Sequence, residues 1–376
     1  MDLMKDNIRV IVSGGGTGGH IFPAISIANA VKALRPDAKI LFVGAEGRME
    51  MQRVPDAGYE IKGLPISGFN RKNPFKNISV IIKLMRSQIM ARKIISDFKP
   101  DVAVGVGGYA SGPTLRMAGR MGIPTLIQEQ NSFAGVTNKL LAKRAERICV
   151  AYEGMERFFS AEKIILTGNP VRQNLTENKV SRPQAAQMMG LDAEKKIILI
   201  IGGSLGARTL NESVMSNLDL IRISKDVQFV WQTGKLYFEE MKSRLEKEQP
   251  VSNLFPMDFV SNMDIAYSAA DLVISRAGAG SISELCLLNK ATILVPSPNV
   301  AEDHQTKNAM ALVNKDAAIH IADVAARKEL IPASISLVQD KERLSKLSEN
   351  IGKLALRDSA DVIAREILRL AGKSDE

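Results

Sequence analysis

The chain has 376 residues, of which 45% are hydrophobic and 24% are charged. This composition is typical of a globular protein and excludes a disordered one, and the length favours two domains. The formal net charge is +9. All of the excess lies in the first half, because residues 1–170 hold 24 basic and 14 acidic residues whereas the remainder holds 26 and 27.

Three further features concern the compartment of the protein. Cys149 and Cys286 both lie in apolar runs, which predicts buried, reduced thiols and favours the cytoplasm. The polar start MDLMKDN leads directly into an expected strand, so we expect no signal peptide. No uncharged apolar run approaches the roughly 18 residues of a spanning helix, so we expect no membrane-crossing segment.

Taken in chain order, the first half alternates between strand and helix patterns. It opens at Ile8–Val31 with an apolar run, a stretch in which five of six residues are glycine, and a helical pattern. A strand, a glycine loop and a helix in this order direct backbone N–H groups and a positive dipole end toward one spot, which suits an anion. Further strands are expected at 39–43, 101–106, 124–128 and 147–151.

The alternation resumes after a polar linker at 173–194. Units of strand, glycine loop and helix are expected at 195–214 and 271–290, and more strands at 227–234, near 251–260 and within 291–298. One last helical stretch is expected at about 341–371. Strands that alternate with helices predict parallel sheets. The expected fold class is therefore α/β, with two doubly wound Rossmann-like domains facing a central cleft.

The first glycine loop admits two interpretations. Gly14, Gly16 and Gly19 match the G-x-G-x-x-G fingerprint of dinucleotide sites, and Asp37 follows at about the expected distance. A nicotinamide-dependent dehydrogenase is therefore one hypothesis. The same glycines also allow a loop that holds a diphosphate or an acceptor group, so this motif is weak by itself.

Two loops of related design follow strands in the second half. Gly202–Gly206 offers backbone N–H groups and the Ser204 hydroxyl to phosphate oxygens. Ser275–Ser281 opens a helix with Glu284 expected in its first turn. That carboxylate either satisfies the helix dipole or accepts both hydroxyls of a ribose. Three loops that can each bind an anion suit a nucleotide diphosphate and a second phosphorylated substrate. A dehydrogenase would use only the first loop and leaves the two loops of the second half unexplained.

Several polar side chains are expected near these loops. His20, one of three histidines, follows directly on the first loop. An isolated histidine is often structural, but at this helix start a neutral imidazole is also placed to act as a general base. Glu129 and Asn131 end a strand at the same edge, and His304 and Gln305 are candidates from the second half. The sequence holds no Cys/His ligand cluster and no P-loop lysine, so we expect neither a metal site nor any cofactor.

Six stretches in order carry a resemblance to a known family: GGGTGGHIFPA, GVGGYASGP, EQNSFAGVTNK, TGNPVR, GGSLGAR and the run from SRAGAGSISEL to DHQTKNA. Over nearly the whole chain they resemble the membrane-associated N-acetylglucosaminyltransferases of peptidoglycan synthesis, the MurG family of GT-B glycosyltransferases. The resemblance implies an inverting hexosyltransferase. Such an enzyme moves N-acetylglucosamine from UDP-N-acetylglucosamine to the 4-hydroxyl of undecaprenyl-pyrophosphoryl-N-acetylmuramyl-pentapeptide. The alternative is another GT-B UDP-sugar transferase that acts on a lipid acceptor.

The resemblance also implies how the chain is divided. Residues 1–170 would form an acceptor and membrane-docking domain, and residues 171–354 a UDP-sugar donor domain. The last helix, at about 355–376, would pack back on the first domain. The implied location is peripheral, at the cytoplasmic face of the bacterial cell membrane.

The resemblance also implies roles for individual residues. In the first domain, Thr17, Gly18 and Gly19 would line the cleft beside the diphosphates. Asn131 would contact the transferred sugar, and Arg172 would lie at the phosphate end of the nucleotide.

In the second domain, Ser204 would bond a donor phosphate, and Val260 would lie beside the uracil and bind largely through its backbone. Glu284 would hold the ribose, and Gln305 would reach the sugar hydroxyls. The diphosphate would be capped by the helix start that comprises Ala279, Gly280, Ser281, Ile282 and Ser283.

Two positions depart from the family pattern. Gln128 stands where the family often has histidine, and Leu205 where it often has glutamine, so His20 is the only histidine expected near the acceptor. The implied reaction is a single inverting displacement, with His20 as first candidate for the general base and Glu129 as second. Helix N-termini and Arg172 would stabilise the leaving diphosphate in place of a metal.

The segment 71–99 holds eight basic residues and one acidic residue. Its apolar face alone is more typical of a core helix; the residues at helical spacing are Ile78, Ile81, Ile82, Met85 and Ile89. Together with Phe69, Phe75 and the basic residues, this face predicts peripheral docking on anionic lipid. A non-catalytic lipid-binding protein is an alternative. No nucleic-acid partner is expected, because the segment has few aromatic residues for stacking.

Overall fold

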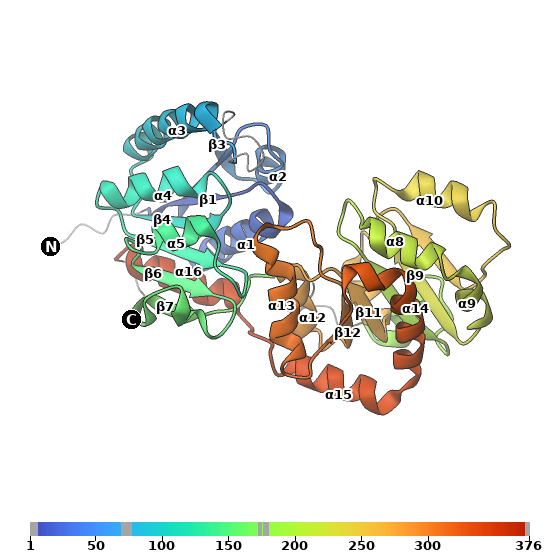
Figure 1. The fold of residues 1–376 in the computed structure, drawn as a ribbon. Helices are drawn as coiled ribbons and strands as arrows, with labels where there is room; N and C mark the ends of the chain where they lie inside the picture. Colours follow the sequence, from blue (N-terminus) through green and yellow to red (C-terminus); the bar gives the residue numbers. More distant parts are fainter. Residues whose placement is uncertain (1–6, 69–76, 172–174, 176–179, 373–376) are drawn as a thin grey trace. The chain divides into compact units, whose positions relative to one another are not determined.

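The computed structural model describes residues 7–68, 77–171, 175 and 180–372. The chain forms two compact units, one of Met1–Arg172 with Arg357–Glu376 and one of Gln173–Leu356 (Figure 1). Each unit is built on a parallel sheet with helices packed against it. The expected α/β class with two Rossmann-like domains is thus confirmed. Among the described residues, no helix has both the length and the apolar character that crossing a bilayer requires.

The sheet of the first unit has seven strands, and every pair of neighbours is parallel. Both of its faces are covered, which explains why its central strands read as continuous apolar runs. In spatial order the strands are β3 (Glu60–Leu64), β2 (Lys39–Ala45), β1 (Arg9–Gly14), β4 (Val102–Gly107), β5 (Thr125–Glu129), β6 (Arg147–Val150) and β7 (Ile164–Leu166).

Helices cover this first sheet from two sides. Helices α1 (Gly18–Leu34) and α16 (Ser359–Leu370) cover one face, and α3 (Asn77–Phe98) and α4 (Ser111–Arg120) cover the other (Figure 1). Alternate residues of β1 therefore divide between the two faces: Val10 and Val12 pack with α1 and α16, whereas Ile11 packs with α3 and α4. The helices are α1 (Gly18–Leu34), α2 (Glu50–Asp56), α3 (Asn77–Phe98), α4 (Ser111–Arg120), α5 (Val136–Leu141) and α16 (Ser359–Leu370), with short 3₁₀ turns η2 (Met155–Arg157) and η3 (Ala161–Lys163).

The second unit has a six-stranded parallel sheet. Its strands in spatial order are β10 (Leu254–Met257), β9 (Val227–Gln232), β8 (Lys196–Ile201), β11 (Leu272–Ser275), β12 (Thr292–Leu294) and β13 (Ile319–His320). The helical segments are α7 (Arg182–Met188), α8 (Arg208–Met215), α9 (Leu218–Ile223), α10 (Phe238–Leu245), α11 (Met263–Ala269), α12 (Ala279–Leu287), η4 (Ala301–Asp303), α13 (His304–Val313), α14 (Asp323–Gln339) and α15 (Lys341–Gly352).

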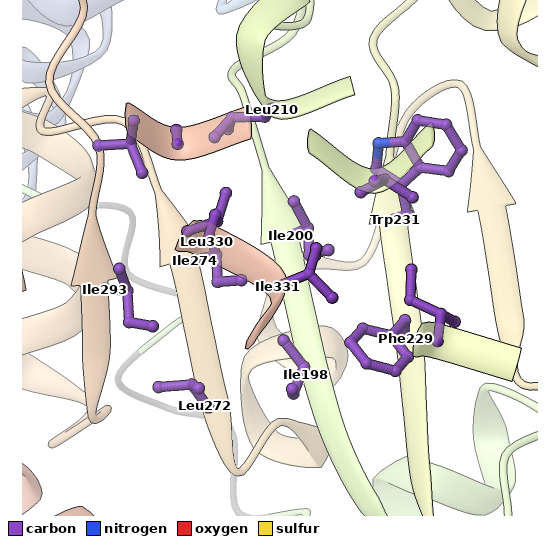
Figure 2. Close-up of a cluster of buried hydrophobic side chains, with 14 of the residues drawn as sticks. Ile198, Ile200, Leu210, Phe229, Trp231, Leu272, Ile274, Ile293, Leu330 and Ile331 are labelled. Carbon is purple, nitrogen blue, oxygen red and sulfur yellow. The ribbon is translucent and has the colours of Figure 1, made fainter. Parts of the chain in front are cut away.

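The core of the second unit lies between one face of its sheet and α14. Ile198, Ile200 and Phe229 project from β8 and β9 toward Leu330 and Ile331 of α14 (Figure 2). The one tryptophan, Trp231, is fully buried there as well, and its indole N–H donates to the Asn211 side chain at 3.0 Å. The buried indole therefore keeps a hydrogen-bond partner, as burial of a polar group requires.

The chain returns to the first unit at its end, where the structure corrects one expectation. The single helical stretch expected at about 341–371 is two helices, because α15 packs on the core of the second unit and α16 on that of the first. Ile363 and Ile367 of α16 are fully buried against the face of the sheet that α1 also covers. Arg147 of β6 adds an ion pair to Glu366 at 3.0 Å.

Both sheets reverse their strand order at one place. The reversal lies between β1 and β4 in the first sheet and between β8 and β11 in the second. In open parallel sheets of this kind, ligands bind outside the carboxyl ends of the strands at that point. The loops that follow these four strands are therefore the place to look for a site, and all three glycine loops found in the sequence are among them.

The two cysteines provide a test of the fold. Both are free thiols, and Cys149 and Cys286 are only 0% and 5% exposed, as their apolar surroundings predict. Burial raises the pKa of both thiols to about 12.

We expect neither thiol to react with an aromatic disulfide reagent in the folded protein at pH 8, because only about one thiol in 10⁴ is ionised four units below its pKa. In guanidinium chloride both should react at once. The released chromophore measures the reaction, and rapid labelling of either cysteine without denaturant would contradict this packing.

Candidate active site

The first glycine loop leads from β1 into α1. The helix begins at Gly18, with Thr17 as its N-cap, so Gly18, Gly19 and His20 are its first three residues. The Thr17 side chain does not cap the helix, and the first turn carries no acidic residue. Thr17 and Gly19 are exposed. This helix start is therefore open to an anion, which its N–H groups and dipole favour.

A buried carboxylate supports the loop from beneath. Glu50 of α2 is fully buried and accepts N–H groups from Gly16 at 2.9 Å and from Ala45 at 3.0 Å. A Cβ atom on Gly15 would lie 2.1 Å from a Glu50 oxygen, so only glycine fits there. The sequence analysis missed Glu50, whose only signal is a carboxylate at the start of a short helix after β2.

The loop after β4 packs directly against the first one. Gly107 has a φ of +96°, and a Cβ atom there would lie 2.8 Å from Cε1 of the His20 ring. A Cβ atom on Gly108 would similarly meet the carbonyl of Gly15 at 2.3 Å. Glycine is therefore needed at positions 107 and 108 because the imidazole of His20 and the backbone of the first loop pack directly against them.

His20 is tied to the end of β5. Its Nδ1 lies 3.1 Å from Oε1 of Gln130, a residue that the sequence analysis did not single out. Gln130 is 3% exposed, and the neighbouring Gln128 is fully buried. A Q-E-Q-N run at the end of a buried strand is the signal that could have identified these amides, because buried polar groups must find partners.

Glu129, the second candidate for the general base, is surrounded by donors. Its Oε1 accepts the N–H groups of the Asn131 backbone and side chain at 3.0 and 3.2 Å. Its Oε2 accepts from the Gly135 backbone at 3.0 Å and the Asn138 side chain at 2.8 Å. The carboxylate is only 2% exposed. This geometry favours holding the 130–135 loop, including Asn131, over contact with a substrate hydroxyl.

The position of Asp37 argues against the dehydrogenase hypothesis. Asp37 precedes β2 and therefore lies at the amino edge of the sheet, whereas the ligand edge is the carboxyl one. Its carboxylate pairs with the Arg35 guanidinium at 2.9 and 3.0 Å. A side chain at that edge is not placed to bind a ribose beside the loop of Gly14–Gly19.

In the second unit, one buried glutamine joins two loops. Gln232, at the end of β9, donates to the carbonyl of Gly203 at 3.0 Å and accepts the N–H of Val260 at 2.9 Å. Ser204 and Leu205 are exposed at the tip of the first of these loops. Val260 has a buried side chain and a backbone N–H that is already engaged, so its carbonyl oxygen is what it can offer a ligand. The sequence analysis missed Gln232.

The loop after β11 corrects the placement of Glu284. The helix α12 begins at Ala279, with Gly278 as its N-cap, so Glu284 is its sixth residue and lies in the second turn. Because the dipole effect fades beyond the first turn, satisfaction of the dipole does not account for this carboxylate. Glu284 instead accepts a hydrogen bond from the Tyr267 hydroxyl at 3.0 Å.

In the first turn of α12, the groups that can contact a ligand are mainly backbone N–H groups. Ile282 is buried, and the Ser283 hydroxyl donates back to the carbonyl of Ala279 at 3.1 Å. Ala279, Gly280 and Ser281 are half-buried at the helix start. Small residues in these positions leave the backbone N–H groups accessible to an anion.

Arg276 secures this loop and does not point at a ligand. Its guanidinium donates to the carbonyls of Val295 and Pro296 at 3.0 and 3.1 Å and to the carboxylate of Asp323. The Thr209 hydroxyl donates to the other oxygen of Asp323 at 2.9 Å. The loops after β11 and β12 and the starts of α8 and α14 are thus held together through one half-buried arginine.

Gln305 lies at the start of α13 and reaches back to the end of β12. Its side-chain oxygen accepts the N–H of Ser297 at 2.8 Å, so its NH₂ group is oriented away from that loop. The two residues before the helix, Glu302 and Asp303, have φ values of +56° and +52°. Left-handed backbone at two successive non-glycine residues costs free energy and often marks a functional loop.

The structure thus gathers most of the predicted residues at two sheet edges. The carboxyl edge of the first sheet holds Thr17, Gly18, Gly19, His20, Glu129 and Asn131. The carboxyl edge of the second sheet holds Ser204, Val260, Ala279, Gly280, Ser281, Ile282, Ser283, Glu284 and Gln305. Arg172 lies outside the described residues. Within the described part of the chain, no group of three or more His, Cys, Asp or Glu side chains is arranged to hold a metal ion.

Two Rossmann-like domains with phosphate-ready loops at their switch points are the architecture of GT-B glycosyltransferases. The crystal structure of Acinetobacter baumannii MurG is similar, with a TM-score of 0.76 and 26% identity over 96% of this chain and 99% of that one. A Neisseria meningitidis UDP-GlcNAc 2-epimerase bound to UDP-GlcNAc shares the fold, with a TM-score of 0.67 and 14% identity over 96% of this chain and all of that one.

The chain belongs to glycosyltransferase family 28, since residues 10–150 match the family's N-terminal domain and residues 197–363 its C-terminal domain. A relative from Bacteroides fragilis is 66% identical over 98% of this chain and 97% of its own length. One from Porphyromonas gingivalis is 56% identical over 96% of each. Both are named UDP-N-acetylglucosamine–N-acetylmuramyl-(pentapeptide) pyrophosphoryl-undecaprenol N-acetylglucosamine transferase.

The contact between Gly107 and His20 can be tested by substitution. We expect Gly107→Ala to lower the rate of glycosyl transfer about tenfold or more, because the new methyl group displaces the imidazole, and a misplacement of about 1 Å at a catalytic group can cost about 10²-fold.

Gly122→Ala is the matched control. Gly122 lies in the same unit with a φ of +75°, but no atom lies within 4 Å of a Cβ placed there. Both variants therefore carry the backbone strain, which thermal unfolding will show, and only Gly107→Ala should lose activity. Equal losses of activity would contradict the proposed contact.

Proposed function

We propose that this protein transfers N-acetylglucosamine from UDP-N-acetylglucosamine to the 4-hydroxyl of undecaprenyl-pyrophosphoryl-N-acetylmuramyl-pentapeptide, which converts lipid I to lipid II in peptidoglycan synthesis. The observation that carries this conclusion is full-length identity of 66% to a relative that bears the name of this enzyme. The anion-ready loops at both switch points support it, because the reaction brings together two diphosphate-bearing substrates.

The second unit would bind the donor. Ser204 and the start of α12, at Ala279, Gly280 and Ser281, would bind the diphosphate, with Ile282 and Ser283 contributing backbone only. Glu284 lies one turn further along the same helix, where its carboxylate would accept the ribose hydroxyls. The Val260 carbonyl would face the uracil, and the NH₂ group of Gln305 the sugar hydroxyls.

The first unit would bind the acceptor. Its diphosphate would lie at the start of α1, against Thr17, Gly18 and Gly19, and Asn131 would contact the transferred sugar from the loop that Glu129 holds. Arg172 would lie at the phosphate end of the nucleotide.

The reaction would be a single displacement with inversion at the anomeric carbon. His20 would take the proton of the muramyl 4-hydroxyl as its oxygen bonds to that carbon, and the bond to UDP breaks on the opposite side. The charge that develops on the leaving diphosphate would be stabilised by helix N-termini and by Arg172. In this mechanism, Glu129 would hold the 130–135 loop in place and would not contact the reacting hydroxyl.

Transfer of labelled N-acetylglucosamine to a short-chain lipid acceptor analogue, with and without a chelator, tests the function. In the same assay, His20→Ala should lower kcat by about 10²- to 10⁴-fold, the usual contribution of a positioned general base. UDP binding, measured by calorimetry, should be unchanged.

Two variants serve as controls. His320→Ala alters a histidine of the edge strand β13 and should leave kcat unchanged. Glu284→Gln should mainly raise the KM for the donor. An unaltered kcat in His20→Ala would remove His20 from the base role, and absence of transfer by the native protein would refute the function itself.

We further infer peripheral docking of the first unit on anionic membrane at the cytoplasmic face of the cell membrane, with α3 at the contact. The core face of α3 consists of other residues, including Ala91 and Ile95. Ile81, Ile82, Met85 and Ile89 are instead 50–71% exposed, so this face is not part of the core, the alternative that its apolar spacing alone favoured. Phe69, Phe75, Arg71, Lys72 and Lys76 lie outside the described residues, as does the side chain of Ile78.

A groove of about 590 Å³ runs beside this helix. Its lining is mainly apolar and comes from α3, α4 and α5, with Leu84, Val136 and Leu140 among the residues. Four exposed cations also border it: Arg116, Arg120, Lys143 and Arg144. Apolar side chains beside cations suit the boundary between acyl chains and anionic headgroups, where each cation contributes about 1 kcal/mol.

Vesicle co-sedimentation with and without anionic phospholipid tests this docking. Ile89→Ser should weaken binding by about tenfold to a hundredfold, because an isoleucine that becomes buried on membrane binding contributes about 1.5–3 kcal/mol. Binding should also weaken as salt rises, because screening reduces the attraction of the cations. Ile223→Ser, at a 73% exposed isoleucine of the second unit, is the control and should bind normally. Binding that ignored both salt and lipid charge would contradict the inference.

A further inference from the structure

A chain of buried side-chain amides lies behind His20. Nε2 of Gln130 donates to the carbonyl of Val106 at 2.7 Å and to Oε1 of Gln128. Nε2 of Gln128 donates to Oδ1 of Asn169 at 2.9 Å. Nδ2 of Asn169 donates in turn to the backbone carbonyl of Gln130 at 3.1 Å. All three amide residues are at most 3% exposed, so these hydrogen bonds are shielded from bulk solvent.

The two ends of this chain determine the direction of every bond in it. The carbonyls of Val106 and Gln130 only accept hydrogen bonds. Asn169 must therefore present its NH₂ group to one of them and its oxygen to Gln128. Gln128 then presents its NH₂ group to Asn169 and its oxygen to Gln130. A flipped amide anywhere would bring two donors or two acceptors together in a buried site, which is unfavourable because both groups would lose their hydrogen-bond partners.

This direction extends to the imidazole. Because the NH₂ group of Gln130 is engaged by Val106 and Gln128, its Oε1 is the atom that faces Nδ1 of His20, at 3.1 Å. An amide oxygen needs a donor there, so Nδ1 must carry the proton. We propose that the chain Asn169–Gln128–Gln130 sets the tautomer of His20, with the proton on Nδ1 and the lone pair on Nε2.

The inference rests on the proposed function for its consequence in catalysis. A general base accepts the proton at the ring nitrogen that holds the lone pair, which is then Nε2. The Nδ1–H bond to Gln130 persists when the ring becomes an imidazolium, because both ring nitrogens then donate. Gln128, Gln130 and Asn169 are positioning residues, and being amides they exchange no proton with the ring.

The tautomer can be measured directly. In protein labelled with ¹⁵N-histidine, two-bond ¹H–¹⁵N correlation spectra distinguish the two neutral tautomers. The chain has three histidines, so the signal lost in His20→Gln identifies His20, and His304 and His320 serve as internal references. For the neutral ring, we expect His20 in the Nδ1–H form.

Gln130→Met tests the cause. Methionine fills a similar volume but cannot replace the amide oxygen. We expect the His20 signal to shift toward the Nε2–H tautomer and kcat to fall by about 10²-fold, the lower end of what a positioned base contributes. The KM for UDP-N-acetylglucosamine should not change.

Gln232→Met is the matched control. This glutamine is equally buried at the end of a central strand, but it belongs to the second unit. The variant should raise the donor KM and leave the His20 tautomer unchanged.

An Nε2–H tautomer in the native protein would overturn the inference, whatever the activity. So would a Gln130→Met variant that kept kcat or kept the native tautomer. These outcomes differ from a failure of the proposed function, which would appear as absence of transfer by the native protein while the tautomer remained as expected.

Discussion

The need of buried polar groups for hydrogen-bond partners shapes both ligand edges of this protein. A loop at the end of a parallel strand has backbone groups that no neighbouring strand satisfies. Here buried side chains satisfy them: Glu50 beneath the first glycine loop, Glu129 in the 130–135 loop, and Gln232 between the loops of Gly203 and Val260. The hydrogen bonds of each of these side chains hold a nearby loop in one conformation without a bound ligand.

This arrangement separates two kinds of polar residue that look alike in a sequence. Glu129 and Arg276 have charges that suit catalysis or phosphate binding, yet their hydrogen bonds go to protein groups. Thr17 and Ser204 are small and exposed at loop tips, beside helix starts or glycines. The groups that would meet substrate are therefore mainly backbone N–H groups and short hydroxyls, held in place by longer side chains. Preorganised donors of this kind need little rearrangement when charge develops on a leaving group.

Much of the fold follows from local sequence patterns. Glycines after apolar runs placed all three loops at the correct strand ends, because a strand, a tight turn and a helix each have a clear signature. Partners distant in sequence have no such signature. Nothing near Glu50 indicates Gly16, and nothing near Gln130 indicates Val106, because these contacts depend on which strands become neighbours. Glu284 fell in the second turn and not the first because helix boundaries are uncertain by a residue or more. On α3, the periodicity indicated one apolar face, but the helix has two. Only tertiary packing decides that the face with Ala91 and Ile95 enters the core.

The departure at Gln128 gains a physical meaning from its surroundings. A histidine at this position would bring a second titratable ring next to Gln130 and Asn169, and the direction of the hydrogen bonds would then depend on that ring's own tautomer and charge. With glutamine, every group between Asn169 and His20 is an amide whose orientation is determined by backbone carbonyls. In the proposed mechanism, uptake of a proton by His20 would therefore leave the other hydrogen bonds unchanged, and no reorganisation behind the ring would accompany the transfer. The opening strand, loop and helix thus place His20, whereas the strand end at 128–130, more than a hundred residues away, would determine which ring nitrogen acts as the base.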